Sequence, residues 1–433
     1  MPSARLPGAV TTAGREARVD PPRASRAALL LDPASRVFRR LTSVTTERVD
    51  VLVVGGGPVG LFAAALLAAR GLRVAVWERR DAPPTGSRAI GIHPPSLDAF
   101  ATVGLDTAVL AEAVLVRTGV ARSRGRVLGT LSFDRASATH PYVATLDQHR
   151  TETLLRDRLG PGVLRTGTAV TALDRHRSHV VAHGTGPGDE PVVVEASFVV
   201  GADGARSAVR DLLGIATTGR DYGDRYVMGD FADPEPSDAR SAALVDVGPL
   251  GVVESFPLPH GRRRYVALVP IEVVPAGDPG TPDPSVARRL AAIVAERTGA
   301  RPDPATCTMT SGFRVRRREA ERVGVGRVVL VGDAAHEISP IGGQGMNLGW
   351  LDAADLAPVL ADAVASGAAG PWPDHARRRQ RAARRAARQA EANMALGRPT
   401  GALGTAAREA LLRTALALPT ADGLAGVYAM RWA

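Results

Sequence analysis

Three closely spaced glycines, Gly55, Gly57 and Gly60, separate a short apolar run from a segment rich in small residues. The preceding VDVLVV is typical of a strand buried on both faces, and the following PVGLFAAALLAA is typical of a helix that begins with Pro58 and Val59. Glycines at these positions permit a tight turn and let backbone N–H groups at the helix start approach a pyrophosphate, whose charge the helix dipole favours. The motif therefore predicts a dinucleotide-binding turn, although packing alone could also require the glycines.

A carboxylate closes the next predicted strand. The segment LRVAVWERR follows the helix, and its Glu78 stands where the ribose hydroxyls of a bound dinucleotide are expected, with Arg79 beside it. A strand, a glycine turn, a helix and a second strand ending in an acid together predict a nucleotide cofactor. This fingerprint by itself does not distinguish NAD from FAD.

Two later segments containing glycine and aspartate bear on that choice. One is FVVGADGARSAVRDLLG, which contains Asp203, and the other is VVLVGDAAHEISPIGGQGMNLGWLDAADLA, which contains Gly332 and Asp333. In their residues, order and separation they resemble two hallmark motifs of the FAD-dependent aromatic hydroxylases, a family of single-component flavoprotein monooxygenases. The cofactor is therefore expected to be FAD.

The resemblance implies a role for each of these segments. Asp203 and its neighbours would help to hold FAD and a transient nicotinamide cofactor, NADPH or NADH, and Asp333 would bind the ribityl chain of FAD. The turn PIGGQGMN would border the isoalloxazine ring, where backbone donors at a helix start stabilise negative charge on a reduced flavin. The cofactor-binding positions implied in this last segment are Gly332, Asp333, Pro340, Gly343, Gly345, Met346 and Asn347.

Two further segments match the family pattern less fully. In SRAIGIHPPSLDAF the resemblance implies that Arg88 approaches the FAD phosphates, and in QHRTETLL it implies that Gln148 and Arg150 flank the flavin. Each arginine would suit a surface charge equally well. The resemblance covers residues 48–220 and 310–365, and it is weak between these ranges, where the substrate should be recognised.

The order of elements predicts an α/β fold. We expect a Rossmann-like FAD-binding domain, a substrate domain with a mixed or antiparallel sheet, and C-terminal helices. The FAD-binding domain is placed at residues 48–218 and 313–370, the substrate domain at 219–312, and the helical region at 371–433. Residues 1–47, rich in Arg, Ala, Pro and Thr, are expected to form a flexible extension.

Local patterns place several elements within these domains. Residues 348–365, 374–392 and 404–418 are predicted to be helices, the second of them arginine-rich and solvated. Residues 170–182 and 192–200 are predicted to be two strands joined by a turn.

Histidine and cysteine patterns give no metal site. His176, His179 and His183 have a spacing like that of metal ligands, but only the last two share a face of the predicted hairpin, so solvated side chains are favoured. His336 is expected to be a structural residue rather than a base. No H-E-x-x-H, C-x-x-C or G-x-S-x-G arrangement occurs, so zinc hydrolysis and serine hydrolysis gain no support.

The formal net charge is +10, and its positive charges are all arginines, because the chain has no lysine. A chain without lysine has no P-loop lysine and no Schiff-base lysine. The arginines are spread along the chain, which disfavours a localised nucleic-acid surface. A single cysteine, Cys307, and the absence of any run of 18 apolar residues favour a cytoplasmic protein with no membrane span.

The family resemblance implies an enzyme. It implies an FAD- and NAD(P)H-dependent monooxygenase that inserts one oxygen atom from O2 into an aromatic or polyketide-like small molecule through a hydroperoxyflavin. The flavin would mediate the chemistry, so no catalytic side chain is named. An alternative that stays open is a flavin-dependent reductase or dehydrogenase that acts on unsaturated substrates without oxygen insertion. A halogenase is disfavoured, because the lysine expected of that group has no counterpart.

Overall fold

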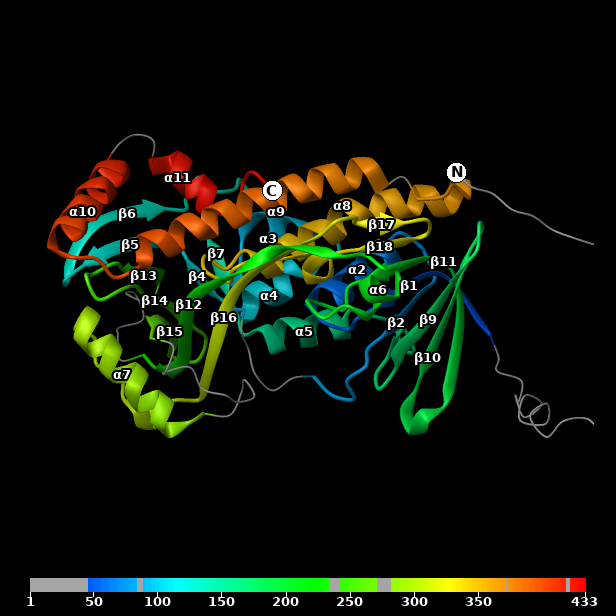
Figure 1. Cartoon of the computed structure of the whole chain (residues 1–433), viewed down its shortest axis with the longest axis horizontal. Coiled ribbons are helices and arrows are strands. Elements are labelled where there is room, and N and C mark those ends of the chain that lie inside the picture. The colour runs from blue at the N-terminus through cyan, green and yellow to red at the C-terminus, as the bar shows by residue number, and fades with distance from the viewer. Residues whose placement is uncertain (1–45, 84–88, 234–240, 271–281, 371, 418–420) are drawn as a thin grey trace, which may run out of the picture. The chain divides into compact units, whose positions relative to one another are not determined.

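The structure is a computed structural model of the whole chain (Figure 1). It describes residues 46–83, 89–233, 241–270, 282–370, 372–417 and 421–433. The predicted extension at residues 1–47 thus lies outside the described residues except for its last two, and Glu47 already begins the first strand. Arg88 also lies outside the described residues.

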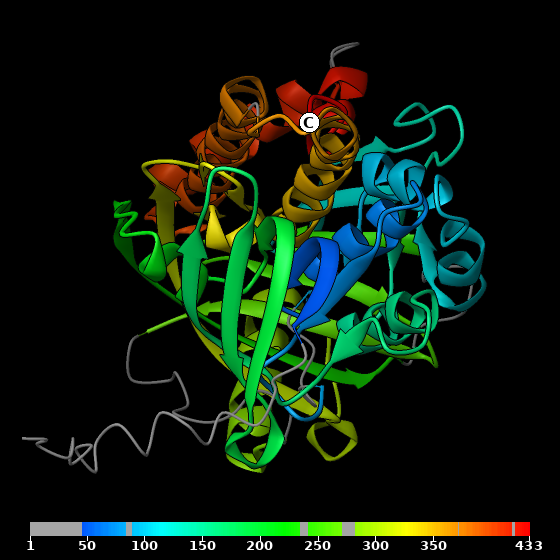
Figure 2. The ribbon, with the colours of Figure 1, turned by 90° about the vertical axis from the view of Figure 1, so that its right-hand side faces the viewer.

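The first sheet, sheet A, is mostly parallel. Its strands are β1 (Glu47–Val54), β2 (Val74–Trp77), β8 (Leu164–Arg165), β9 (Ala169–Arg175), β10 (Val180–Thr185), β11 (Pro191–Gly201), β17 (Gly324–Val325) and β18 (Val328–Leu330). The main order is β17-β18-β11-β1-β2-β8, and β10 extends antiparallel from β11 and pairs with β9. Figure 2 shows β9, β10 and β11 (green) side by side. Because β18, β11, β1 and β2 run parallel, their carboxyl ends lie at one edge of the sheet.

Helices cover sheet A because its strands are apolar on both faces. Helix α2 (Pro58–Ala68) and helix α8 (Gly345–Ser366) pack with β1 around Phe62 and Trp350, which are fully buried. The opposite face is covered by the β9–β10 hairpin and by α6 (Ala208–Leu212), whose Val209 is buried among the strand side chains. A strand buried on both faces is apolar throughout, as the VDVLVV run indicated.

The second large sheet, sheet C, is mostly antiparallel. Its strands are β5 (Thr118–Ser123), β6 (Arg126–Ser132), β12 (Thr217–Ala232), β13 (Ala242–Asp246), β14 (Val253–Leu258), β15 (Arg262–Val269), β16 (Met309–Ala320) and β19 (His336–Glu337). They follow the order β19-β16-β12-β15-β14-β13-β5-β6. Helix α7 (Pro284–Thr298) covers one face, as Figure 1 shows, and Leu290 and Val294 are buried there.

A third, smaller sheet and further helices complete the described part of the fold. The third sheet has the order β3-β7-β4, from β3 (Gly91–Ile92), β7 (Val143–Thr145) and β4 (Val114–Val116). The remaining helices are α3 (Pro94–Ala101), α4 (Asp106–Glu112), α5 (Gln148–Asp157), α9 (Trp372–Gly397), α10 (Ala402–Ala417) and α11 (Ala421–Tyr428). Short 3-10 turns within the described residues include η1 (Pro187–Asp189), η4 (Pro304–Thr306) and η5 (Gly332–Ala334). The predicted fold class, a Rossmann-like sheet with a second sheet and C-terminal helices, is confirmed.

The predicted domain boundaries do not follow the sheets. Strands β5 and β6 lie inside the range 48–218, yet β5 pairs in parallel with β13 and so belongs to sheet C. Most of β16 likewise lies in the range 313–370, although it pairs with β12. A strand's own residues reveal its alternation but not its partner, because the partner is chosen by contacts between segments far apart in the chain.

The predicted strand at 170–182 is itself a hairpin. The chain turns at His176, whose backbone N–H donates to the carbonyl oxygen of His179 at 2.9 Å. The rings of these two histidines stack with centroids 4.5 Å apart, and His183 pairs with Asp174 at 2.8 Å. Among the described residues, no group of three histidine, cysteine or acidic side chains is placed to hold a metal ion.

The arginine-rich helix α9 is only partly solvated, which corrects the prediction. Its alanine face, which includes Ala383 and Ala386, is buried against neighbouring elements. Arg379 is buried as well, because its Nε donates to the carboxylate of Asp352 on α8 at 2.7 Å. None of the helices in the described part of the chain combines the length and apolar character needed to cross a membrane.

Successive arginines at the start of β15 are each paired with an aspartate. Arg264 is 1% exposed and donates to Asp230 of β12 through two nitrogens, at 2.6 and 2.8 Å. Arg263 pairs with Asp233 at 2.9 Å, and Arg262 with Asp147, which precedes α5. These pairs hold the hairpin of β14 and β15 against β12 and against the start of α5.

We expect Asp230→Ala to destabilise the fold by about 3–5 kcal/mol, because it leaves the Arg264 guanidinium buried without its carboxylate. Urea unfolding of the FAD-free protein measures this loss. The double variant Asp230→Leu with Arg264→Met should recover much of it, since a buried ion pair can be replaced by apolar groups. Equal loss in both proteins would contradict this account.

Candidate cofactor site

Four parallel strands end next to one another at the edge that carries the predicted motifs. Val54, the last residue of β1, pairs with Gly201 of β11 on one side and with Trp77 of β2 on the other. Gly201 pairs in turn with Leu330 of β18. The glycine turn, Glu78, the Asp203 segment and the Asp333 segment each follow one of these strand ends, so the fold brings together motifs that are far apart in the sequence.

Two backbone segments approach each other at the glycine turn with no room for side chains. Gly55 has a φ of +112°, and a Cβ there would lie 2.4 Å from the carbonyl oxygen of Ala202. A Cβ on Gly60 would lie 1.9 Å from the carbonyl oxygen of Gly55. Glycine is therefore required at both positions by packing. The sequence allowed this explanation as an alternative to cofactor binding.

Gly57 differs from its neighbours. It caps α2 with a φ of −81°, a backbone conformation open to any residue, and a Cβ there would meet no atom within 4 Å. Its glycine therefore has no packing reason within the protein. Open space beside the free N–H groups at a helix start fits an approaching pyrophosphate.

Val59 joins the glycine turn to the Asp333 segment. A Cβ on Gly349 of α8 would lie 2.4 Å from a Val59 methyl, and one on Gly332 would lie 3.3 Å from it. The carbonyl oxygen of Pro58 accepts a hydrogen bond from Trp350 Nε1 at 3.0 Å. Pro58 and Val59 thus fix the start of α2 against α8.

Glu78 is buried at 5% exposure and is engaged within the protein. Its carboxylate accepts hydrogen bonds from the backbone of Gly56 at 2.8 Å and from the backbone and Nε of Arg80, both at 2.9 Å. Burial alone would raise the pKa of Glu78, but the hydrogen bonds and charge of Arg80 outweigh it and lower the pKa. Arg79 is exposed, whereas Arg80, which the sequence did not single out, is the partner of this acid. A ribose contact by Glu78 stays a prediction.

Asp203 also makes bonds within the protein. Its carboxylate accepts from Ser207 Oγ at 2.5 Å and from the backbone of Val209 at 3.0 Å, so it holds the start of α6. Arg210, on the same helix, donates to the carbonyl oxygen of Ala334 at 3.2 Å and so ties this segment to the one that carries Asp333. The side chain of Asp203 shapes the turn, and its direct contact with a cofactor stays a prediction.

Asp333 is the acid at this edge that is left exposed. It accepts no hydrogen bond and forms no ion pair with any residue that the structure describes, although Gly332 and Ala334 on either side are buried. Such a carboxylate is available to the hydroxyls of a bound polyol chain. This fits the role that the family resemblance implies for it.

The turn that carries Asp333 is fixed by a buried charged group that sequence reasoning missed. Asp352 of α8 accepts from the backbone N–H of Gly332 at 2.9 Å, from His336 Nε2 at 2.7 Å and from Arg379 Nε at 2.7 Å. Burial alone would raise the pKa of Asp352, but the charges of His336 and Arg379 lower it far below its ordinary value. His336 is thus a structural residue, as the sequence suggested.

The predicted flavin turn leads into α8. Gly343 has a φ of +67° and donates from its backbone to the carbonyl oxygen of Pro340 at 2.9 Å, and both residues are exposed. Gly345 begins the helix, and Met346 packs partly against the core of sheet A. The first backbone N–H groups of α8 follow directly after this turn and have no acceptor within the helix.

Asn347 is fully buried and braces this turn from behind. Its Nδ2 donates to the carbonyl oxygens of Gly343 at 3.0 Å and of Gly91 at 2.9 Å, and its Oδ1 accepts from the backbone of His93 at 2.9 Å. The asparagine therefore joins the turn to β3 and α3. It positions the turn through these bonds rather than presenting its amide to solvent.

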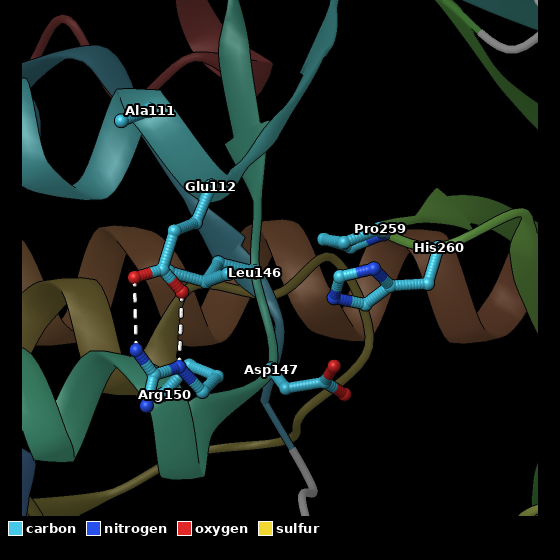
Figure 3. A pocket seen from close by; sticks show the side chains of 7 residues that line it. All are labelled: Ala111, Glu112, Leu146, Asp147, Arg150, Pro259 and His260. Carbon is cyan, nitrogen blue, oxygen red and sulfur yellow. Dashed lines mark hydrogen bonds and ion pairs between the residues drawn. The ribbon is translucent and has the colours of Figure 1, made fainter.

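Gln148 and Arg150, both on α5, serve different neighbours. Gln148 accepts from the backbone of Ala89 at 3.3 Å, next to the undescribed segment that contains Arg88. Arg150 donates to Glu112 of α4 through two bonds of 2.9 Å. Both residues line a pocket of about 520 Å³, and Figure 3 shows their side chains there. None of the residues lining this pocket belongs to the glycine turns. A flavin contact by either side chain stays a prediction.

The geometry suits a dinucleotide such as FAD. The pyrophosphate would lie at the free N–H groups beside Gly57, the ribityl chain at Asp333, and the ring system against the turn from Pro340 to Gly343. The observations that support this placement are the open space at Gly57 and the unpartnered carboxylate of Asp333.

Comparisons with known proteins agree with this geometry. The family model described as "FAD binding domain" matches residues 48–391. The chain is 37% identical over 326 residues to 6-methylpretetramide 4-monooxygenase of Streptomyces rimosus, a match that covers 73% of this chain and 56% of the relative. It is 36% identical to the 12-dehydrotetracycline 5-monooxygenase/anhydrotetracycline 6-monooxygenase of Streptomyces rimosus subsp. rimosus, over 73% of this chain and 63% of the relative.

Among solved structures, p-nitrophenol 4-monooxygenase from Pseudomonas putida DLL-E4 superposes with a TM-score of 0.78 at 25% identity. The match covers 89% of this chain and 98% of that one. In contrast, this chain spans between about half and two thirds of the two tetracycline-type relatives, 56% and 63% of their lengths.

Substitution of single glycines distinguishes a role in FAD binding from a role in packing. We expect Gly57→Ala to change the free energy of unfolding of the FAD-free protein by less than about 1 kcal/mol, because its Cβ meets nothing. The same variant should weaken FAD binding about tenfold or more, measured by titration of flavin fluorescence. Gly60→Ala is the contrasting control: its Cβ overlaps a carbonyl oxygen and should destabilise the FAD-free protein by about 3 kcal/mol. Unchanged FAD affinity in Gly57→Ala would contradict the placement of the pyrophosphate.

Two aspartates at this edge should behave oppositely. Asp333→Asn should leave the stability of the FAD-free protein within about 0.5 kcal/mol, because its carboxylate has no partner there, and should weaken FAD binding. Asp352→Asn should cost about 3–5 kcal/mol in urea unfolding. Because the pKa of Asp352 is lowered in the folded protein, its contribution is present above about pH 4 and is lost as the pH falls. Equal effects of both variants on unfolding would refute the distinction.

Proposed function

Because the chain belongs to the FAD binding domain family, as a match over residues 48–391 shows, we propose that it is a flavin-dependent monooxygenase acting on aromatic or polyketide-like small molecules. The observation that carries the proposal is the meeting of the glycine turn and the Asp333 turn at one edge of sheet A, where Val59 also lies against Gly349 of α8, the helix into which the turn after Pro340 leads. FAD bound there would supply the chemistry that activates O2 for insertion of one oxygen atom.

On this proposal the protein's own share of the reaction is placement. Gly57 and the start of α2 would bind the pyrophosphate, and Asp333 would accept hydrogen bonds from the ribityl hydroxyls. The turn at Gly343, braced by Asn347, offers backbone donors and the start of α8 to the ring system, where they stabilise negative charge. No side-chain nucleophile is needed for such a reaction.

Exclusion of water is the second contribution. The loop residue Ile341 is buried in one apolar cluster with Tyr226, Met228 and Val266 of sheet C and with Met394 of α9. A substrate held between this turn and sheet C would be surrounded largely by apolar side chains. Such surroundings protect a reactive oxygen species from loss to solvent.

The names of the relatives support the substrate class. Two curated relatives are named for oxidation of tetracycline-type polyketides, and the solved structure described above is named for oxidation of p-nitrophenol. None of these three is named as a reductase. We further propose that NADPH or NADH supplies the electrons by binding transiently. The sequence contains one glycine fingerprint of the Rossmann type, and the proposal assigns that fingerprint to FAD, so the nicotinamide cofactor has no such turn of its own.

Labelled oxygen tests this function. The FAD-loaded protein is incubated with NADPH and, in separate reactions, with anhydrotetracycline or p-nitrophenol under 18O2. We expect substrate-dependent NADPH oxidation and a product carrying one 18O atom, detected by mass spectrometry. Product without label would instead favour a reductase. The Asp333→Asn protein, assayed at saturating and at limiting FAD, serves as the matched control, because its defect should follow FAD occupancy.

A further inference from the structure

One row of side chains across sheet C carries a single charge. Strand by strand, the paired residues of this row are Ser311, Met228, Val266, Glu254, Val245 and Ala121. Paired residues on neighbouring strands point to the same face of a sheet. Glu254 of β14 therefore rises from an otherwise uncharged row, with a valine on either side.

This face looks toward the turn where the flavin ring is proposed to lie. Met228 and Val266, in the same row as Glu254, are buried in one cluster with Ile341 of that turn and Met394 of α9. Val253, the next residue on β14, belongs to the cluster on the opposite face, under α7. Glu254 thus lies on the face of sheet C that is turned toward Ile341 and the flavin turn.

The carboxylate of Glu254 has no partner of its own. Glu254 is 9% exposed, and it accepts no hydrogen bond and forms no ion pair with any described residue. In the same cluster, the Tyr226 hydroxyl is buried and has no hydrogen-bond partner, while its ring stacks on Phe313 with centroids 5.5 Å apart. Buried polar groups are normally hydrogen-bonded, so two unpartnered groups on one apolar face indicate a polar group of a ligand.

Several other charged and titratable groups near this face are engaged with one another. On β12, Asp230 pairs with Arg264, and Asp224 pairs with Arg398 at 2.8 Å. On α11, the Tyr428 hydroxyl donates to Asn393 of α9 at 2.9 Å.

A third acid near this face, Glu391, is also paired. Glu391 of α9 accepts from the Tyr222 hydroxyl and pairs with Arg220 at 3.2 Å. Burial raises the pKa of both Tyr226 and Tyr428, so both remain neutral near pH 7. Glu254 is the acid on this face whose charge is not compensated by another residue that the structure describes.

We propose that Glu254 is a specificity-determining residue that selects uncharged, hydroxyl-bearing aromatic substrates over carboxylates. The inference rests on the proposed function, because it places the substrate between sheet C and the flavin. An ionised Glu254 accepts a hydrogen bond from a substrate hydroxyl, which satisfies its oxygens, and it repels a negatively charged substrate.

The charge of this residue changes near neutral pH. Burial raises the pKa of Glu254 to about 7. Above that value the ionised carboxylate accepts a hydrogen bond and repels anions, and below it the neutral group does not repel them. Discrimination against carboxylates should therefore grow as the pH rises through neutrality.

A matched pair of ligands tests the selection. The FAD-loaded protein is titrated with 1-naphthol and with 1-naphthoate, and binding is followed by the change in flavin absorbance and by calorimetry. At about pH 8 we expect 1-naphthol to bind more tightly, and we expect Glu254→Gln to reduce the ratio of the two affinities about tenfold. Glu296→Gln is the control, because it removes an exposed charge from α7 on the opposite face and should leave the ratio unchanged.

Several outcomes would overturn the inference. They are an unchanged ratio in Glu254→Gln, equal binding of the two ligands by the wild-type protein, or binding of neither. Should Glu254→Gln fail to fold, the wild-type protein decides alone, because its ratio must fall between about pH 8 and pH 6 as Glu254 becomes protonated. Selection that depends on Glu254 without 18O incorporation would count against the proposed function only, whereas oxygenation with selection unaffected by Glu254 would count against this inference only.

Thermal unfolding gives a reading independent of any ligand. The raised pKa means that the unfolded chain loses this proton at lower pH than the folded protein does, so ionisation of Glu254 destabilises the fold as the pH rises from about 4.5 to about 7. The melting temperature of Glu254→Gln minus that of the wild type should therefore increase over this range. A difference that does not vary with pH would contradict the uncompensated burial of this carboxylate.

Discussion

A side chain at residue 60 would need the space held by the carbonyl oxygen of Gly55, and one at residue 55 would collide with the backbone of Ala202. This close crossing of two chain segments depends on β1 and β11 ending side by side at Val54 and Gly201. Because the two backbone segments are in contact there, the crossing fixes the position and direction of the start of α2 at the edge of the sheet. The open space at Gly57, and with it the proposed pyrophosphate position, follows from that direction.

The same edge is stabilised from behind by buried polar groups that bond to the backbone of the turns. Asp352 holds the backbone of Gly332 while it is itself held by His336 and Arg379, and Asn347 holds the turn that contains Gly343. Fixing the turns in this way leaves the exposed groups free for binding, since the buried side chains do the positioning. Asp333 then has no partner among the described residues, because its neighbours are satisfied by other groups.

Sheet C contributes a different kind of surface. Its face toward the flavin turn is apolar apart from a few polar groups, and most of these are paired, as Asp230 is with Arg264. The uncompensated Glu254 and the unpartnered Tyr226 hydroxyl depart from that rule. In a site built to bind a neutral ring system, such groups provide discrimination rather than stability, because their burial is unfavourable unless a ligand pairs with them.

The sequence by itself determined the elements whose signals are local. The strand, glycine turn and helix around Gly57, the family motifs around Asp333, and helices α8 to α10 were all readable, because periodicity and turn residues act over short stretches of chain. The tertiary structure alone decided the partners of side chains. In the structure Asp203 bonds to the start of α6, and Arg150 pairs with Glu112. Arg379 is buried against Asp352, and β5 pairs within sheet C. These outcomes depend on contacts between distant segments. The residues adjacent in sequence do not indicate which distant group a side chain will contact.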